Sequence, residues 1–226
     1  MRHIPRPKNS DAPAIFRDWL AKHPAAHYSR LGNSRIKSEL KHSLVARQAY
    51  LCGYCECRIF DETSHIEHVE PQFGGVSDKT LTYSNMLASC IKDPKSGRGL
   101  PAFSAESAIH CGHARGTHEV VCPYDSDCEK YFEYSFSGEV RPNPKLADPR
   151  KRMLAVDSIG YLRLNVPSLV VGRKIAMTEA IRLFQAGVPR EKILGKSDSK
   201  LLPFWSAAKF ALDRLAAKRR PKTPRK

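Results

Sequence analysis

The chain has 226 residues, of which 41% are hydrophobic and 27% are charged, a balance that predicts a globular protein. No stretch approaches the run of about 20 apolar residues that a membrane-spanning helix needs, and residues 1–13 lack the apolar segment of a secretion signal. Lysine and arginine number 38 against 23 acidic residues, for a net charge of +15. Such a charge favours polyanions, of which nucleic acid is the commonest large one, although a basic surface can also serve solubility.

The cysteine content indicates metal binding rather than disulfide bonds. The chain contains seven cysteines, an odd number, and shows no secretion signal, so a disulfide framework is not expected. In a reducing cytoplasm, clustered thiols are more often metal ligands. The composition therefore predicts a cytoplasmic protein that contains zinc, with seven thiols to choose from: Cys52, Cys55, Cys57, Cys90, Cys111, Cys122 and Cys128.

Residues 1–50 predict an N-terminal helical segment. One short helix is expected over 11–23 and a second over 35–50, with Asn33-Ser34 at the N-cap of the second. The apolar positions of the second helix follow helical spacing at Ile36, Leu40 and Leu44.

Residues 51–146 are expected to form the core of the protein, beginning with a cysteine-rich turn. The expected elements, in chain order, are extended pieces at 58–60 and 65–69, a turn rich in proline and glycine, a loop with a short helical turn at 81–90, a surface insertion at 91–110, a helix start or basic loop at 110–118, and a hairpin at 131–141 that turns at Ser137-Gly138.

Residues 147–218 are predicted to be helical and are the candidate region for docking a partner. One helix is expected over 167–186, with Gly187 as its stop, and another over 201–218. The tail, 219–226, is a basic run with prolines and is expected to be disordered.

A zinc site is predicted from four of the cysteines. Cys52 and Cys55, with two residues between them, can bind one tetrahedral zinc from a tight turn that Gly53 eases. Cys90 and Cys111 would complete a closed structural site, although as buried free thiols they would need no metal. Three further cysteines are available in their place: Cys57, Cys122 and Cys128. A redox role for the motif is not favoured, because no thioredoxin-like βαβ pattern follows.

The segment His65-Ile66-Glu67-His68 carries residue types suited to metal-dependent hydrolysis. Ile66 and Val69 would fix an extended strand in the core. Glu67 is a hard oxygen ligand for magnesium or manganese, whereas His68 is suited to activate water as a general base near neutral pH. In a strand these two side chains point to opposite faces, so one can bind the metal while the other faces the scissile bond. The alternative is a polar surface strand.

Three more polar residues belong to the candidate site. His113 comes just after Cys111, so a zinc at that cysteine would hold it in place to lend a nitrogen to a second, catalytic metal. Arg115 is close to His113 in the sequence and is expected to contact a phosphate of the substrate. Asn85 is included because of its place in the order of the motifs.

This order of motifs resembles the HNH nuclease superfamily: CxxC, a Glu-His pair followed by proline, an asparagine, a cysteine, and then Cys-x-His. The closer resemblance is to the HNH proteins of retron and Septu anti-phage defence systems (PtuB-like). It is carried by LCGYCECRI, SHIEHVEPQ, YSNMLASC and HCGHARG, and more loosely by CEKYFEYSFSGEV and DSIGYLRLNVPSLVVGRKIAM, across roughly residues 40–180. The resemblance implies an α+β fold with a ββα-metal core and a structural zinc knuckle, flanked by N-terminal and C-terminal helices.

The resemblance also implies a role for each candidate residue. His68 would be the general base, and Glu67 and His113 would bind a catalytic Mg²⁺ or Mn²⁺. His118 is an alternative to His113, and His65 is expected to lie beside the metal or to substitute as a ligand. Asn85 would brace the loop that carries the base. The structural Zn²⁺ would be bound by Cys52, Cys55, Cys90 and Cys111.

The implied function is hydrolysis of phosphodiester bonds in DNA or RNA, as the effector of an anti-phage defence system. His68 must be neutral to accept a proton, so activity is expected to fall below about pH 6. Septu-type proteins act with an ABC/SMC-like ATPase, which in retron systems joins a reverse transcriptase and its RNA–DNA product, and such partners are expected here. Two alternatives stay open: an RNase or tRNase toxin with the same centre, and a non-catalytic, zinc-stapled module that binds nucleic acid.

Overall fold

The computed structural model describes residues 1–70, 78–91 and 109–219. Within these ranges the protein is a mixed α+β structure with two small antiparallel sheets of two strands each. Its strands are β1 (Ser64–His68), β2 (Met86–Cys90), β3 (Phe132–Tyr134) and β4 (Val140–Pro142). Its helices are α1 (Ala14–Lys22), α2 (Arg35–Arg47), α3 (Gly112–Arg115), α4 (Pro149–Tyr161), α5 (Pro167–Gln185), α6 (Arg190–Leu194) and α7 (Trp205–Arg219).

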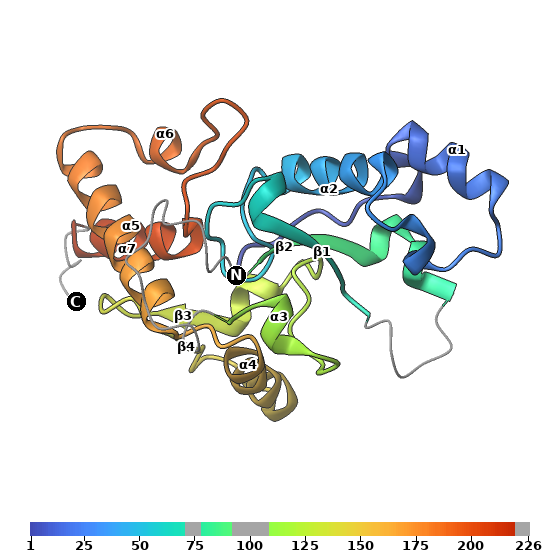
Figure 1. Cartoon of the computed structure of the whole chain (residues 1–226). Helices are drawn as coiled ribbons and strands as arrows, with labels where there is room; N and C mark the ends of the chain where they lie inside the picture. Colours follow the sequence, from blue (N-terminus) through green and yellow to red (C-terminus); the bar gives the residue numbers. More distant parts are fainter. Residues whose placement is uncertain (71–77, 92–108, 220–226) are drawn as a thin grey trace.

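Most elements pack around one main core, and the buried residues of α6 belong to a second, smaller cluster with α5 and α7. Figure 1 shows α2 along the sheet of β1 and β2, α1 beyond it, and the C-terminal helices α5, α6 and α7 at the opposite end. One cluster of buried apolar side chains extends from Met1 to Ala211, so the N-terminal, central and C-terminal segments share it. None of the helices in the described ranges is long and apolar enough to cross a membrane.

The first sheet positions the acidic and histidine residues of β1. The strand alternates between buried and partly exposed residues, so His65 and Glu67 lie on one face and His68 on the other. All five residues of β2 are buried, and β2 follows a short 3₁₀ turn over Tyr83–Asn85. The turn was predicted but the strand was not, because a short apolar run without alternation does not distinguish a strand from a loop or helix.

The end of α2 is joined to β2 by a buried glutamine. Gln48 donates from Nε2 to the carbonyl oxygens of Ala88 and Leu51 at 2.7 and 2.9 Å, and its Oε1 accepts from the amide of Ala88 at 2.6 Å. Ala49 and Tyr50 then adopt positive φ angles of 54° and 61°, which a helix cannot continue through. Helix α2 therefore ends at Arg47, a few residues before the end at residue 50 that the sequence predicted.

The β3–β4 hairpin confirms the predicted turn and is fastened to α5. Gly138 has φ +95°, and a Cβ atom there would lie 2.1 Å from the carbonyl oxygen of Val170, so only glycine fits this close approach. The buried guanidinium of Arg173 donates to the carbonyl oxygens of Gly138 at 3.1 Å and Leu164 at 2.6 Å. This one side chain thus joins the hairpin turn, the chain before α5 and α5 itself.

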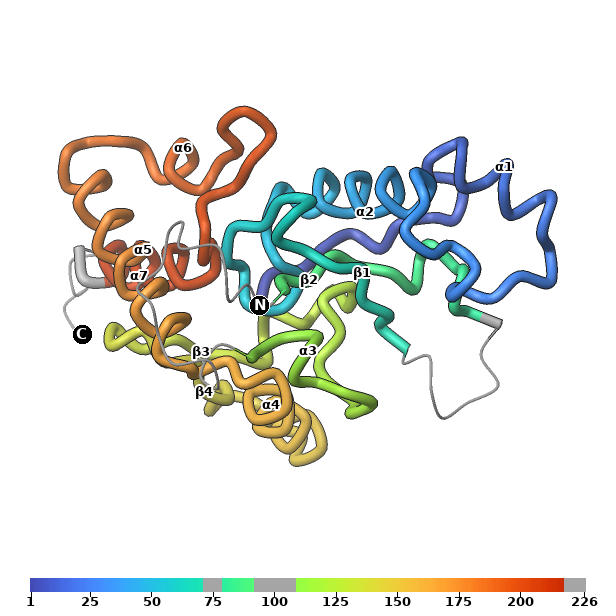
Figure 2. Tube along the Cα trace, viewed as in Figure 1, coloured from blue at the N-terminus to red at the C-terminus, as the bar shows by residue number. Residues whose placement is uncertain are grey.

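Glu56 connects the cysteine-rich turn to the ends of the chain. It is buried, with φ +65°, and its Oε2 accepts from the backbone amide of Ser206 at 2.7 Å. Its carbonyl oxygen accepts from the amide of Phe204 at 2.8 Å, and its Oε1 lies 3.0 Å from the amino group of Met1. Figure 2 shows the N-terminus at the middle of the molecule, between β2 and the C-terminal helices.

Some elements differ in the structure from the elements that the sequence predicted. The piece at 58–60 forms no strand of its own and contributes a single bridge, between Leu51 and Arg58. The last helix, α7, begins at Trp205 rather than at residue 201, because the amide of Leu201 donates to the carbonyl oxygen of Ala49 instead. The predicted proline-glycine turn, surface insertion and basic tail fall mainly on residues outside the described ranges: 71–77, 92–108 and 220–226.

Replacement of Arg173 by methionine is expected to destabilise the fold. Two buried carbonyl groups would lose their donor, at a cost of about 3 kcal/mol in the free energy of unfolding. The control is Arg182→Met on the same helix, where the exposed arginine forms an ion pair with Glu179. Chemical denaturation should show a lower midpoint for Arg173→Met and a nearly unchanged midpoint for Arg182→Met, whereas equal midpoints would contradict this role.

Candidate functional site

Four of the seven cysteines come together in the core. The sulfur atoms of Cys52, Cys55, Cys90 and Cys111 all lie within 4.8 Å of one another, and all four residues are buried. The sulfurs of Cys55 and Cys90 are 3.8 Å apart, and four thiolates around one tetrahedral zinc would be separated by about 3.8 Å. Donor type, number and spacing therefore fit a metal such as zinc, and these are the four ligands that the sequence predicted.

The ligands come from three separate parts of the chain. Cys52 and Cys55 flank a tight turn, closed by hydrogen bonds from the amide of Glu56 to the carbonyl of Cys52 and from the amide of Cys52 to the carbonyl of Cys57. Cys90 ends β2, and Cys111 directly precedes α3. The cluster thus joins the turn, the sheet and α3. The three other cysteines, Cys57, Cys122 and Cys128, lie outside this group.

Two of the four thiols of the cluster ionise more readily than an ordinary cysteine. Burial alone would raise the pKa of Cys52 and Cys55, but hydrogen bonds from neighbouring thiols, that of Cys111 foremost, hold the pKa of both well below the ordinary value. The contact with Cys111 raises the pKa of Cys90, and burial raises the pKa of Cys111 itself. A bound cation would displace the remaining protons, as metal binding to thiolates requires.

Polar groups around the sulfurs complete the cluster. The amide of Cys90 donates to the sulfur of Cys52 at 3.4 Å. The Nδ1 atom of His110 lies 3.2 Å from the sulfur of Cys111 and 3.4 Å from that of Cys90. Ser89 lies 3.8 Å from the sulfur of Cys52 through its hydroxyl, which also accepts from the amide of Gly112. Contacts of this kind orient metal ligands and stabilise their charge.

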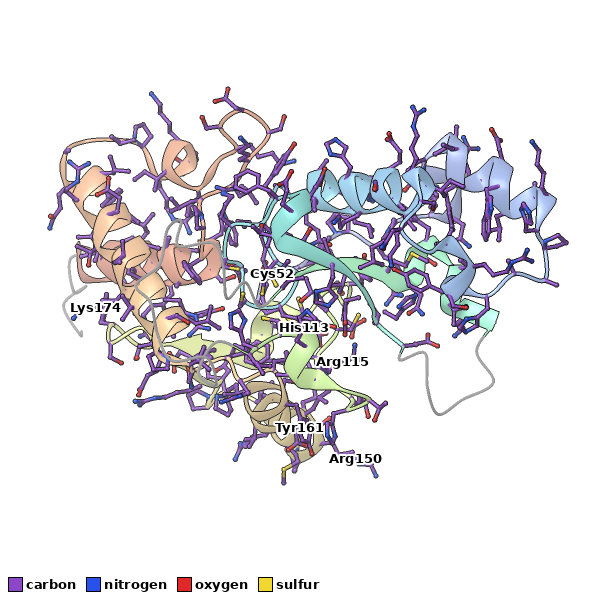
Figure 3. All side chains as sticks on the ribbon, in the orientation of Figure 1. Cys52, His113, Arg115, Arg150, Tyr161 and Lys174 are labelled. Carbon is purple, nitrogen blue, oxygen red and sulfur yellow. The ribbon has the colours of Figure 1, made fainter. Side chains whose placement is uncertain are left out.

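A second group of polar side chains lies beside the cysteine cluster. Glu67 and His65 project from one face of β1, with His65 Nε2 3.4 Å from Glu67 Oε2. The rings of His65 and His113, which comes from α3, have their centroids 4.3 Å apart. His113 is exposed to solvent, and His65 Nδ1 is buried with no hydrogen-bond partner among the described residues. Figure 3 labels Cys52, His113 and Arg115 in the central part of the molecule.

This second group is more open than the cysteine cluster. Within the ranges that the structure describes, the four cysteines are the only group of three or more potential ligands whose donor atoms all lie within 4.8 Å. The partial burial of its ring and the nearby His65 lower the pKa of His113, so its ring is neutral at pH 7. Burial opposes ionisation of Glu67, but the hydrogen bond with His65 and the charge of Arg115 bring its pKa below the ordinary value. A carboxylate and imidazole nitrogens are a donor set that accepts a divalent cation.

Arg115 is buried in the protein instead of facing a phosphate, as the sequence suggested it would. Its side chain is 3% exposed, and its guanidinium donates to five acceptors. They are Glu67 Oε1 at 3.1 Å, the hydroxyl of Tyr54 at 3.0 Å, and the carbonyl oxygens of His68, Val69 and His118 at 2.8, 2.6 and 2.9 Å. Arg115 therefore fixes the Glu67 carboxylate and ties the end of β1 to α3.

His68 occupies the opposite face of β1 and is held by the backbone. Its Nε2 lies 2.8 Å from the carbonyl oxygen of Thr80, which can only accept, so Nε2 donates. In the neutral ring the lone pair that can take a proton is therefore on Nδ1. Burial lowers the pKa of His68, which keeps the ring neutral at pH 7. The ring of Tyr28 packs edge-on against it, with centroids 4.7 Å apart.

Asn85 braces the segments on either side of His68. Its Oδ1 accepts from the amide of Glu70 at 2.8 Å, and its Nδ2 donates to the carbonyl oxygens of Glu70 and Lys79 at 3.2 and 3.3 Å. Its own carbonyl oxygen accepts from the amide of Val69 at 2.8 Å. These bonds connect the chain just after β1 with the turn that contains Thr80, and so fix the backbone that holds His68.

Gly112 allows a close approach of α3 to β1 that the sequence did not predict. A Cβ atom there would lie 2.6 Å from Glu67 Oε2 and 2.7 Å from His65 Nε2, closer than such atoms can approach. The backbone of α3 therefore touches the acidic face of β1 directly. The signal in the sequence was a glycine between Cys111 and His113, which reads as an ordinary helix start until the packing of α3 on β1 is known.

Comparison with known proteins does not constrain the site further. No protein-family model matches the chain, and no curated protein matches it. What the site does is therefore inferred from its own residues and their geometry.

Replacement of Cys111 by serine is expected to abolish stoichiometric zinc binding, because three thiolates leave the tetrahedral site open. The matched control is Cys128→Ala, which removes an equally buried thiol outside the cluster. Elemental analysis of the purified proteins should find one zinc per chain in the wild type and in Cys128→Ala. Full zinc content in Cys111→Ser would show that these four sulfurs do not form the site.

Proposed function

We propose that the chain is a metal-dependent HNH nuclease, whose ββα-metal core consists of β1, β2 and α3. The observation that carries the proposal is the meeting of Glu67 and His65 on β1 with His113 on α3, directly beside a cysteine cluster that anchors α3. The base expected of such a centre, His68, follows Glu67 and is neutral and fixed by Thr80. The net charge of +15 supports a polyanionic substrate.

The residues of the second group fit a divalent cation. Glu67 is ionised, His113 is neutral and exposed, and His65 has a buried nitrogen without a partner among the described residues. Glu67 and His113 would hold Mg²⁺ or Mn²⁺, with His65 beside it or as a substitute ligand. When bound, the cation supplies charge stabilisation to the scissile phosphate and the leaving oxygen.

The remaining chemistry belongs to the protein's own side chains. His68 Nδ1 accepts a proton from the attacking water, and the bond from Nε2 to Thr80 holds the ring in the tautomer that this transfer needs. Arg115 keeps the Glu67 carboxylate in one orientation through its 3.1 Å contact with Oε1. Asn85 holds the backbone on both sides of His68. Because each of these contacts is internal, the centre is preorganised before substrate arrives.

The resemblance to retron and Septu proteins adds a biological setting to this proposal. The chain would act in the cytoplasm as the effector of an anti-phage system, together with an ABC/SMC-like ATPase and, in a retron, a reverse transcriptase with its RNA–DNA product. Cleavage assays should therefore be run with and without such an ATPase.

Substitution of His68 or His113 by alanine is expected to reduce cleavage at least about a hundredfold, because loss of a general base or of a metal ligand removes a transition-state interaction. Cleavage of plasmid DNA and of total RNA is measured with Mg²⁺ or Mn²⁺, and zinc content is checked in parallel. The control is His42→Ala, which removes an exposed histidine whose partner is Asp61.

The outcomes separate the nuclease from its rivals. Loss of cleavage in both variants with full zinc content supports the proposal, and the substrate that is cut decides between a DNase and an RNase. Cleavage that survives in both variants refutes this centre. Salt-sensitive binding of nucleic acid without any cleavage by the wild type would favour the non-catalytic module.

Gly112→Ala is expected to impair cleavage while leaving zinc in place. The added methyl group would push Glu67 and His65 away from α3, and displacement of a metal ligand by about 1 Å can cost about a hundredfold in rate. Gly160→Ala is the control, since a Cβ atom at that position meets nothing within 4 Å. Wild-type rates in Gly112→Ala would mean that the approach of α3 to β1 does not matter for catalysis.

A further inference from the structure

Two exposed aromatic rings stack against each other near α3. The rings of His118 and Tyr161 have centroids 3.7 Å apart and planes only 4° from parallel, the most nearly parallel ring pair in the described part of the chain. Both residues are exposed, and Tyr161 retains 38% of its accessible surface. A flat aromatic surface left open to water is well suited to stack on another planar group.

The stacked pair is fixed to the same helix that carries His113. The carbonyl oxygen of His118 accepts from Nε of Arg115 at 2.9 Å, and the amide of His118 donates to the carbonyl of Arg115. On the other side, the carbonyl oxygen of Leu162, next to Tyr161, accepts from the amide of Cys111 at 2.9 Å. The two rings are thus held by backbone bonds at both ends of α3, and Figure 3 shows Tyr161 on the side of α4 below Arg115.

An exposed arginine lies close to the rings in the sequence. Arg163 comes two residues after Tyr161, has φ +49°, and is exposed. Its guanidinium has no hydrogen-bond or ion-pair partner within residues 1–70, 78–91 and 109–219. His118 is followed by the exposed acid Glu119, whereas Arg163 lies two residues after Tyr161, so the residues next to Tyr161 are the more favourable neighbours for an anion. A ring with a neighbouring free arginine is the combination that binds a nucleotide through its base and its phosphate.

We propose that His118, Tyr161 and Arg163 form a binding surface for an unpaired nucleotide of the substrate, in which a base stacks on the exposed aromatic face and Arg163 contacts a phosphate. This inference rests on the proposed nuclease function and narrows its substrate class. Bases inside a duplex are stacked on one another and are not available to a protein ring, whereas those of a single strand or a flap are. The substrate is therefore a nucleic acid with an unpaired segment next to the scissile bond.

The test measures binding without added magnesium or manganese, so that zinc stays bound and nothing is cut. The probes are a fluorescent oligothymidylate, an abasic strand of equal length, and a duplex of equal length, each followed by fluorescence anisotropy. Tyr161→Leu should weaken binding of the oligothymidylate about tenfold, the typical loss for one stacked base, and Tyr161→Phe should retain it. Neither variant should change binding of the abasic strand, and the wild type should prefer the oligothymidylate to the duplex.

The matched control is Phe60→Leu, which removes a similarly exposed ring, 41% accessible, elsewhere on the surface. Equal binding of the oligothymidylate by the wild type and Tyr161→Leu would overturn the proposal. So would an equal loss on the abasic strand, or a wild type that does not bind the oligothymidylate at all.

The two proposals fail separately. His113→Ala should bind the oligothymidylate as the wild type does and fail to cleave it. Base-dependent binding through Tyr161 with no cleavage by the wild type would retain the stacking surface and refute the nuclease. If cleavage depends on His113 and its rate is unchanged in Tyr161→Leu, the proposed nuclease function stands and the proposed stacking surface is refuted.

Discussion

Four sulfur atoms within 4.8 Å of one another hold three distant parts of this chain at one point. The turn at Cys52 and Cys55, the end of β2 at Cys90 and the start of α3 at Cys111 would otherwise have to be joined by a core with few long elements. Buried thiolates this close together repel one another, and a bound metal cation neutralises their charge. Because the complete site exists only in the folded chain, the free energy of metal binding adds to the free energy of folding. The cluster is thus the constraint from which the positions of β1, α3 and, through Glu56, α7 follow.

The proposed centre depends on this anchor through short, traceable links. Cys111 fixes the start of α3, and Gly112 allows the backbone there to touch the side chains of Glu67 and His65. The guanidinium of Arg115, at the end of α3, then donates hydrogen bonds to Glu67 and to the carbonyl oxygen of His68. The two faces of β1 are therefore held by different parts of the molecule. The face with His65 and Glu67 is held by α3, and the face with His68 by the turn that contains Thr80. Loss of the anchor would release the first face while the second kept its contacts.

Local patterns predicted a large share of this arrangement. Four features depend on residues that are near one another in the sequence, where the periodicity of a strand or helix and the chemistry of a turn fix the geometry. They are the pair Cys52 and Cys55, the opposite faces of Glu67 and His68, the hairpin at Gly138, and the helix that ends before Gly187. The choice of Cys90 and Cys111 as the other two ligands agreed with the observed cluster, although spacing alone left three other cysteines open.

The rest could not be read from sequence because it arises from contacts between segments far apart in the chain. Arg115 was predicted to contact a phosphate, yet three of its acceptors lie more than forty residues earlier, on β1 and directly after it. The strand β2 is buried on both faces and so lacks the alternation that reveals a strand. Likewise, the pairing of His118 with Tyr161 requires α4 to return to the end of α3, which no local pattern encodes.

The most direct test of the account is a crystal of the protein soaked in Mn²⁺, with anomalous diffraction recorded at the zinc and manganese absorption edges. The account predicts two separate peaks, zinc among the four cysteine sulfurs and manganese beside Glu67 and His113. A zinc peak alone, or manganese bound only among the cysteines, would contradict the claim that the cysteine cluster supports a second, catalytic metal site.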